Sequence, residues 1–574
     1  MKSFLPVFPP RRAASHVSDA SDAADAGASV RASLDQPAVT RAAFFTLSTL
    51  PLASALGAWS RRACAQSTAD ASSETKPEPP RRASHLSHVH RHAPAASAAS
   101  AAMPSSVETE LLDADDARHL LIRTGFAPAG ADLAPYVGLT RAEAVDRVLA
   151  TARTEAVTQL PAWCAEPLPT RAERNAWTPD QRRDAQRTRG RHYDELRAWW
   201  MGEMLVTPSP VTERMTLFWH NHFTSGQDKV PEPQMMAQQN SLLRRHALGN
   251  FATMLHEVAK DPAMLLYLDG ASNRKGKPNE NFAREVMELF TLGEGQYTQQ
   301  DVAEAARAYT GWAVDSDTGQ FVSRPAQHDD GVKTVLGHSG PFDGDAMLDI
   351  LLGEPQTAHF VAAKMWREFV SDTPDTAQLD HVAAHFRASR YDISAALRAL
   401  LLTPAFWDER NRGVLVSSPV TFIVGTIRRF GVTYGDTAPF ARTSAALGEN
   451  LFYPSNVKGW PGGVAWINSS TLLARKQFVE QLFRATEAAR PRMAAAMTKT
   501  AAKAPPRTQG GMRFDLDGWL ARYGLSASDK PDLSQQLQMQ HAVLPLAPVD
   551  AIAAGSSAQA YLQALLMDPV YQLT

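Results

Sequence analysis

The chain has 574 residues, of which 44% are hydrophobic and 21% are charged, so it is long enough to bury a sizeable core and could by length alone hold several domains. Its formal net charge is −2: residues 1–104 carry 11 Lys/Arg against 7 Asp/Glu, and the remainder carries 47 against 53. A mildly acidic body gives no reason to expect a nucleic-acid-binding protein, and two cysteines exclude a framework of disulfides.

Residues 1–104 have the composition of a segment without a stable fold. They are rich in Ala, Ser, Pro and Arg, and such a segment buries too little apolar surface to offset its chain entropy. One apolar run, residues 42–59, is followed by Ala63-Cys64-Ala65, a small-x-small pattern that suits signal peptidase. We therefore predict a disordered N-terminal region at 1–104 with a signal peptide at about 41–65.

Cleavage of this signal would release a periplasmic or secreted protein without a stable membrane span. A single membrane anchor is the alternative, but Pro51 interrupts the apolar run, and the run is near the lower length limit for spanning a bilayer. The export route, general or twin-arginine, stays open because Arg41 stands alone where a twin-arginine motif has two arginines.

The remaining chain is dominated by helix-forming residues, and turn-bounded runs of β-branched residues are few. The sequence therefore predicts a mainly α fold, with one large helical domain over residues 105–490 that includes one small β-hairpin. Residues 491–515 are rich in Ala, Lys, Pro and Gly, and are predicted to form a mobile insertion. Residues 516–574 are predicted to be a C-terminal helical segment that packs on the core.

The β-hairpin is predicted from two short apolar runs, residues 320–324 and residues 332–336. Between them lies Asp330-Gly331, a residue pair typical of tight hairpin turns. The two runs are therefore expected to pair with each other across this turn.

Residues 278–293 predict an amphipathic, substantially buried helix that ends at Gly293. Its apolar positions follow the spacing i, i+4, i+7 and i+8, and are Phe282, Val286, Leu289 and Phe290. On the polar side, Glu285 and Glu288 lie on neighbouring turns, and Arg284 is placed to pair with a carboxylate. Asn281 and Arg284 are therefore expected to belong to a structural polar network.

His220 and His222 lie near the end of another predicted helix, residues 211–223. Two residues on a helix are separated by roughly 200°, so the two imidazoles are not expected to face the same side if both are helical. If the helix ends near Trp219, an extended His220-Asn221-His222 would instead put both rings on one side. We expect His222, with or without His220, to meet Glu285 or Glu288 at one polar site inside the helical bundle.

This polar site allows two interpretations. Imidazole and carboxylate groups from facing helices can hold a divalent metal ion, which would make His220, His222, Glu285 and Glu288 metal ligands. The last three would then be catalytic residues of a hydrolase, with metal-activated water. The alternative, which we favour, is a buried structural network, because a histidine on an apolar face is usually satisfied by a carboxylate or carbonyl.

Two further groups of residues are weaker candidates. His328 and Asp329 lie in the predicted turn region, where loop residues often carry function, although polar turn residues are most often only solvated. Trp312, Trp460 and Trp466 stand in glycine-rich surroundings and could line an aromatic groove for glycans or peptides. The simpler interpretation, which we favour, is that glycine allows tight turns while the indoles pack in the core.

Several long motifs occur in a fixed order along the chain. They are Leu120-Leu-Ile-Arg-Thr-Gly-Phe126, Phe218-Trp-His-Asn-His-Phe223, Asp269 to Gly293, Tyr309-Thr-Gly-Trp312, His328-Asp329, Val457-Lys-Gly-Trp-Pro-Gly-Gly463, Gly462 to Asn468 and Asp568-Pro-Val-Tyr-Gln572. In these motifs the sequence resembles the bacterial domain-of-unknown-function family numbered 1800, over roughly residues 108–485 and the last turn.

The resemblance implies an uncharacterised exported bacterial protein. Members of that family are often encoded beside exported proteins that resemble alkaline phosphatases and sulfatases, so the resemblance also implies such a protein as a partner. Two function classes remain: a non-catalytic, partner-binding protein of the cell envelope, which is favoured, and a metal-dependent hydrolase with a His/Glu site in a helical bundle. Only the second would require a divalent metal as cofactor.

Overall fold

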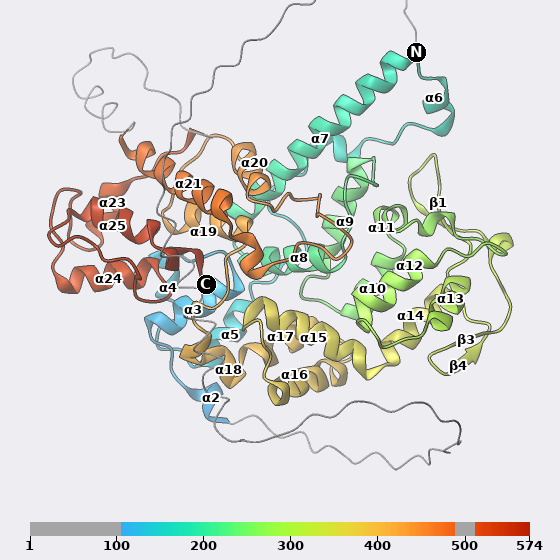
Figure 1. Cartoon of the computed structure of the whole chain (residues 1–574), viewed down its shortest axis with the longest axis horizontal. Coiled ribbons are helices and arrows are strands. Elements are labelled where there is room, and N and C mark those ends of the chain that lie inside the picture. Colours follow the sequence, from blue (N-terminus) through green and yellow to red (C-terminus); the bar gives the residue numbers. More distant parts are fainter. Residues whose placement is uncertain (1–104, 488–510) are drawn as a thin grey trace, which may run out of the picture. The chain divides into compact units, whose positions relative to one another are not determined.

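The computed structural model describes residues 105–487 and 511–574, shown in colour in Figure 1. The predicted signal peptide and the rest of residues 1–104 lie outside the described residues, as does most of the predicted insertion at 491–515. Where the description resumes, Met512 and Phe514 are only 1% and 2% exposed. This apolar pair, within the predicted insertion, belongs to the core.

Helices dominate the described residues, which confirms the predicted mainly α fold. The α-helices are α2 (Ser105–Thr109), α3 (Ala114–Thr124), α4 (Gly130–Leu133), α5 (Arg141–Leu149), α6 (Arg171–Ala176), α7 (Pro179–Val206), α8 (Pro210–His222), α9 (Pro233–Arg245), α10 (Phe251–Ala259), α11 (Pro262–Tyr267), α12 (Glu280–Glu285), α13 (Gln299–Ala308), α14 (Gly344–Gly353), α15 (Pro355–Phe369), α16 (Thr376–Ala388), α17 (Ile393–Leu401), α18 (Pro404–Trp407), α19 (Pro419–Arg429), α20 (Ala438–Ala446), α21 (Ser469–Glu487), α23 (Leu516–Ala521), α24 (Leu533–Val543) and α25 (Ala558–Met567). The short 3-10 helices are η1 (Ala162–Ala165), η2 (Gly270–Ser272), η4 (Pro325–Gln327), η5 (Glu409–Asn411), η6 (Gly463–Trp466) and η8 (Pro569–Gln572), whereas η3 (Val286–Thr291) is a π-helix.

The strands form two small antiparallel pairs: β1 (Trp312–Val314) with β2 (Phe321–Ser323), and β3 (Lys333–Val335) with β4 (His338–Gly340). Both predicted runs contain a strand, but the predicted pairing between them is wrong, because each strand pairs with its nearer neighbour. The tight turn lies at Leu336-Gly337, where φ is +49° and +81°. Positive φ at both central residues is typical of the two-residue type I′ turns that connect hairpin strands.

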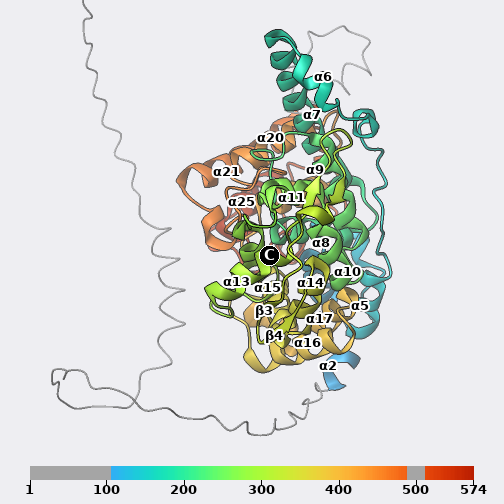
Figure 2. The same ribbon diagram turned by 90° about the vertical axis from the view of Figure 1, so that its right-hand side faces the viewer.

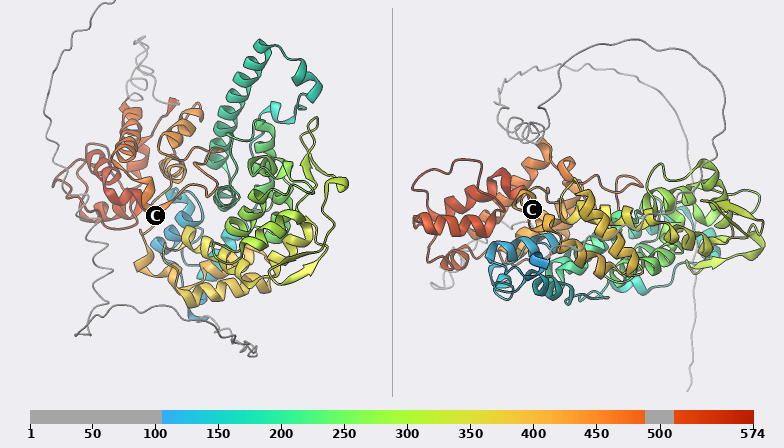
Figure 3. Two further views of the ribbon diagram at one scale, coloured as in Figure 1. Left: turned by 45° about the vertical axis from the view of Figure 1, so that its right-hand side comes forward. Right: turned by 90° about the horizontal axis from the view of Figure 1, so that it is seen from below.

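The C-terminal segment packs into the same hydrophobic core as the earlier helices. Phe430, at the end of α19, contacts the rings of Phe514 and Trp519 at centroid distances of 5.3 and 5.5 Å. The chain end also pairs with the segment before α19, since the backbone N–H of Ser417 donates to the carbonyl of Gln572 at 2.8 Å. The right-hand view of Figure 3 shows the C-terminal helices, in red, beside α3, in blue.

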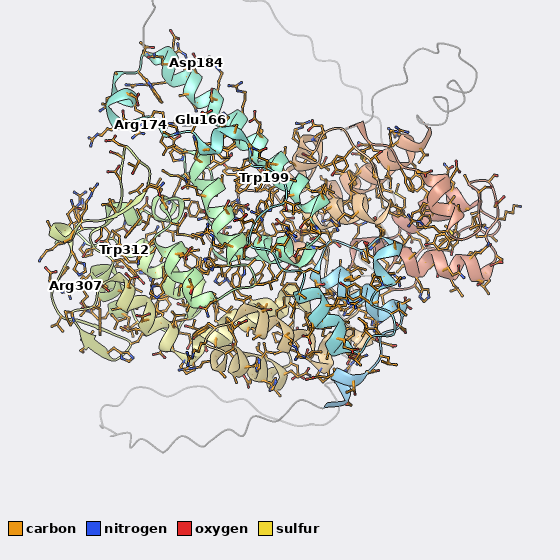
Figure 4. All side chains as sticks on the ribbon, turned by 180° about the vertical axis from the view of Figure 1, so that it is seen from behind. Glu166, Arg174, Asp184, Trp199, Arg307 and Trp312 are labelled. Carbon is orange, nitrogen blue, oxygen red and sulfur yellow. The ribbon has the colours of Figure 1, made fainter. Side chains whose placement is uncertain are left out.

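The longest helix, α7, is buried only in its second half. Figure 2 shows α6 and the first turns of α7 extending beyond the neighbouring helices. The second half carries Trp199, labelled in Figure 4, and Trp200. These indoles bring α7 into contact with an ion pair between Glu213 on α8 and Arg244 on α9.

A fully buried ion pair joins α8 to α9. Glu213 and Arg244 are each 1% exposed, and two hydrogen bonds of 2.6 and 2.9 Å connect the guanidinium to the carboxylate. The indole N–H of Trp200 also donates to Glu213 at 2.8 Å, and Asn240 accepts a further bond from Arg244 at 2.7 Å. These bonds satisfy both charges, which would otherwise be very costly to bury.

We expect Glu213→Ala to lower the free energy of unfolding by about 3–5 kcal/mol, because Arg244 would remain buried without its counter-charge. Asp180→Ala is the matched control, because it removes the carboxylate of the exposed Asp180–Arg183 pair on α7 and should cost less than about 1 kcal/mol. Urea denaturation of both variants measures the difference. Equal losses would show that the buried pair is not a principal support of the fold.

Candidate functional site

The predicted helix at 278–293 exists as two continuous elements, α12 and the π-helix η3. Asn279 caps its start by accepting the backbone N–H of Asn281 at 3.0 Å, and the chain leaves the helix at Gly293, whose φ is +89°. Phe282, Val286 and Phe290 are fully buried, as predicted. Leu289 is only half-buried, because the i→i+5 bonding of a π-helix changes the angular spacing of the side chains.

His222, the last residue of α8, lies against the end of this helix. It is 3% exposed, and its Nε2 donates to the backbone carbonyl of Phe290 at 3.2 Å. Its Nδ1 accepts a hydrogen bond from the ammonium of Lys364, on α15, at 3.2 Å, and the same ammonium donates to the carbonyl of Leu289 at 3.0 Å. Both nitrogens of the imidazole are therefore occupied by structural partners.

The electrostatics favour this arrangement. Burial, reinforced by the positive charge of Lys364, lowers the pKa of His222 well below its ordinary value, so the imidazole is neutral at physiological pH. Burial also lowers the pKa of Lys364 to about 8, with a smaller contribution from Arg367. The lysine lies at the C-terminal carbonyls of η3, the end of a helix that attracts positive charge.

The carboxylates of Glu285 and Glu288 do not join the histidines. Glu288 accepts a hydrogen bond from the hydroxyl of Tyr297 at 2.6 Å and lies 3.8 Å from the ammonium of Lys458. Burial and the neighbouring Glu288 raise the pKa of Glu285. The two carboxylates stay neighbours but do not bond to the histidines, because His222 bonds to the backbone of η3 while Glu288 bonds to Tyr297 and lies near Lys458.

No metal-binding group takes their place in the described part of the chain. Among residues 105–487 and 511–574, no set of three or more His, Cys, Asp or Glu side chains is grouped so that it could hold a metal ion. The predicted set of His220, His222, Glu285 and Glu288 is thus not brought together, and the geometry favours the structural network over the metal site.

Arg284 and Asn281 take part in hydrogen bonds that position α12. Arg284 pairs with Glu280 at 3.2 Å and donates to Gln299 at 2.8 Å, so its carboxylate partner is neither of the two glutamates that follow it. The pair is surface-accessible, with 35% of Arg284 and 41% of Glu280 exposed. Asn281 donates to the carbonyl of Leu268 at 3.0 Å, which satisfies the C-terminal end of α11.

His220 lies on the other side of α8. Its ring packs against Trp200, Phe452 and Trp460 at centroid distances of 5.4, 5.4 and 5.6 Å. Burial lowers its pKa to about 3, and its Nε2 has no hydrogen-bond partner among the described residues. The two histidines face different sides, as helix geometry predicts, yet both are buried because other elements surround the end of α8.

Asn221, between the two histidines, joins two motifs that are far apart in the sequence. Its Oδ1 accepts the backbone N–H of Trp460 at 2.7 Å. A side chain at Gly459 would bring a Cβ within 2.2 Å of this oxygen, so only glycine permits the approach. Sequence reasoning did not assign Asn221 this role, although the glycine of Lys458-Gly-Trp460 was a signal that the backbone is approached closely here.

The three tryptophans proposed for an aromatic groove are core residues. Trp312, Trp460 and Trp466 are only 6%, 5% and 6% exposed, so they cannot offer an open stacking surface. Trp312, labelled in Figure 4, packs against Tyr309 and Phe282 at centroid distances of 5.2 and 6.2 Å. Their burial favours the core interpretation over the groove interpretation for these residues.

His328 and Asp329 attach the strand region to α13 instead of standing at a hairpin tip. Asp329 forms a two-bond ion pair with Arg307, at 2.8 and 3.2 Å, which holds the pKa of this carboxyl well below its usual range. His328 bonds through Nδ1 to the carbonyl of Thr310 at 2.9 Å. Lys333 is fully buried and donates to the carbonyl of Asp329. These contacts fix the chain between β2 and β3.

Comparison with known sequences adds the family. A family model described as "Protein of unknown function (DUF1800)" matches residues 119–573. The chain belongs to this family. No curated protein and no solved structure matches it. The DUF1800 match extends from α3 to the C-terminal segment, so it includes α8, η3 and the loop around Trp460, the three parts that meet at Asn221 and His222.

If His222 is structural, His222→Ala should lower the free energy of unfolding by roughly 2–4 kcal/mol, because it leaves a cavity, an unpaired carbonyl at Phe290 and a lysine that has lost one of its two acceptors. His359→Ala on α15 is the control, since this histidine is 39% exposed and should cost less than about 0.5 kcal/mol. Thermal and urea unfolding measure both. An unchanged midpoint for the His222 variant would contradict the structural role.

The buried His220 predicts a loss of stability in acid. Its pKa is about 3 in the folded chain and 6.5 ordinarily, so below pH 6.5 the unfolded chain binds a proton that the folded chain does not. As the pH is lowered between these two values, the contribution of His220 to the free energy of unfolding should fall by about 1.4 kcal/mol per pH unit. Urea denaturation at several pH values in this range measures how the free energy of unfolding depends on pH. His220→Phe should remove the part of that dependence that His220 causes. Identical slopes for the two proteins would refute the assignment.

Proposed function

We propose that this DUF1800 protein is an exported, non-catalytic binding protein of the bacterial cell envelope. The observation that carries the proposal is the use of the predicted catalytic side chains as structural partners. His222 bonds to a backbone carbonyl and a lysine, Glu288 to a tyrosine, and Asp329 to an arginine. These groups thus connect neighbouring elements of the fold, which supports a structural use for them.

The location of the surface hollows supports the same proposal. Four hollows in the described part are lined by residues of α3, α7, α24 and the segment 121–136, among others. None of these four contains His222, Glu285, Glu288, His328 or Asp329. A ligand or partner bound in one of these four hollows would therefore lie away from these five candidate residues. No observation on the described residues favours the alternative of a metal-dependent hydrolase.

Export is supported by the sequence before the described domain. The apolar run at 42–59 and the small-x-small pattern at 63–65 suit recognition and cleavage by signal peptidase. In the described residues, no helix has both the length and the apolar character needed to cross a membrane. The partner we propose is an exported protein resembling alkaline phosphatases and sulfatases, as the family resemblance implies.

Cell fractionation followed by mass analysis of the mature chain tests the export proposal. We expect the protein in the envelope or periplasmic fraction, with an N-terminus created near Ala65. Ala63→Asp and Ala65→Asp, which break the small-x-small pattern, should leave the precursor uncleaved. A chain that begins at Met1 and remains in the cytoplasmic fraction would overturn the proposal.

A further inference from the structure

Two adjoining hollows between α3 and α24 form a groove, here named the α3–α24 groove. Their volumes are about 320 and 490 Å³, and both are lined by Asp115, Arg118, Leu537 and His541. The first extends to the loop 544–547, and the second extends to α4 and α23. Figure 3 shows α3, in blue, beside the C-terminal helices, in red.

The groove has a positive lining on a body that is otherwise slightly acidic. Its arginines are Arg118, Arg412, Arg429 and Arg522, and the aspartate that lines it is Asp115. Outside residues 1–104 the chain has 53 acidic against 47 basic residues, so this excess of arginine is local. Such a surface attracts an anionic ligand.

Two of these arginines have no carboxylate partner among the described residues. Arg118 pairs with Asp115, and Arg412 pairs with a carboxylate of α3. By contrast, Arg429 donates to the backbone carbonyl of Val543, and Arg522 is exposed and forms no ion pair in the described chain. These two guanidinium groups both line the larger hollow, which makes it the place where acidic groups would be bound.

Apolar side chains in the same groove favour a ligand with an apolar part. Leu537 lines both hollows and is 46% exposed, and Leu533, one turn earlier on α24 and outside the lining, is 72% exposed. The smaller hollow is lined by Ile122, Leu544 and Leu546. Exposed leucines that adjoin a hollow mark a binding surface more often than leucines scattered singly on a surface.

We propose that the α3–α24 groove binds an acidic peptide segment of a partner protein, with carboxylates at Arg429 and Arg522 and leucine-sized side chains against Leu537 and the smaller hollow. The inference rests on the proposed binding function and names the surface that performs it. A peptide suits the groove because the two hollows adjoin and the exposed leucines extend beyond them, so that a chain can contact both. Electrostatic complementarity would set its specificity and its rate of association.

Fluorescence anisotropy with the purified mature chain tests the proposal. The probe is a labelled synthetic peptide of alternating Glu and Leu, compared with a Lys/Leu peptide and a Glu/Ser peptide of the same length. Only the Glu/Leu peptide should bind, and the affinity should weaken as salt is added. The Lys/Leu peptide binding equally well, or no binding of the Glu/Leu peptide at any accessible concentration, would overturn the proposal.

Two variants locate the binding surface. Arg522→Glu and Leu537→Glu should each weaken binding about tenfold or more, which corresponds to about 1.4 kcal/mol or more. Arg182→Glu, an equal charge change on the exposed part of α7, should leave the affinity unchanged. Equal weakening by Arg182→Glu would reveal non-specific charge attraction and overturn the proposal. Unchanged thermal midpoints for all three variants establish that folding is not the cause.

A fourth probe separates the peptide from a small anion. The dipeptide Glu-Glu should compete only weakly, because it cannot contact both hollows. Competition as strong as that of the Glu/Leu peptide would assign the groove to a small molecule and overturn the peptide proposal. These measurements use purified protein, so their failure would leave the result of the export experiment intact, and a cytoplasmic location would not alter the measured affinities.

Discussion

The burial of α8 on every side is the constraint on which the rest of the structure depends. The polar side chains of such a helix are removed from water, and an unpaired buried polar group costs roughly 2–7 kcal/mol. Four polar side chains of α8 are accordingly matched to four different elements: Glu213 to α9, Arg214 to α15, Asn221 to the backbone at Trp460, and His222 to η3. The chemistry of the motif residues therefore fixes the positions of the surrounding helices.

From the sequence alone, the histidines and carboxylates on these apolar helices are also candidates for a metal or acid–base site, because such sites use the same side chains. The geometry separates the two possibilities. His222 bonds to a carbonyl at the C-terminal end of a π-helix, and Lys364 completes its bonding. The partners in this network are all within the protein, whereas the α3–α24 groove is open and contains two guanidinium groups without a carboxylate partner in the described chain. In the function proposed here, architecture and binding belong to different parts of the chain.

The fold class, the helix at 278–293 and the opposite orientations of His220 and His222 could be predicted from the sequence, because each follows from local periodicity. The partners of these residues could not. The π-helix places backbone carbonyls within hydrogen-bond reach of His222 and Lys364. No side-chain pattern in the sequence predicts a π-helix here. The strand pairing was missed for a similar reason: the turn is made by Leu336-Gly337, and leucine rarely adopts positive φ, so Asp330-Gly331 gave the stronger but misleading signal.

Native-state hydrogen exchange of the α8 backbone amides tests the central claim most directly, because it reports whether this helix opens separately from the rest of the domain. If α8 holds the surrounding helices together, its interior amides, from Met215 to Trp219, should exchange only through global unfolding. Their opening free energy should then equal the unfolding free energy measured with denaturant. Exchange of these amides at a clearly lower free energy, while α15 and α19 stay protected, would contradict the account.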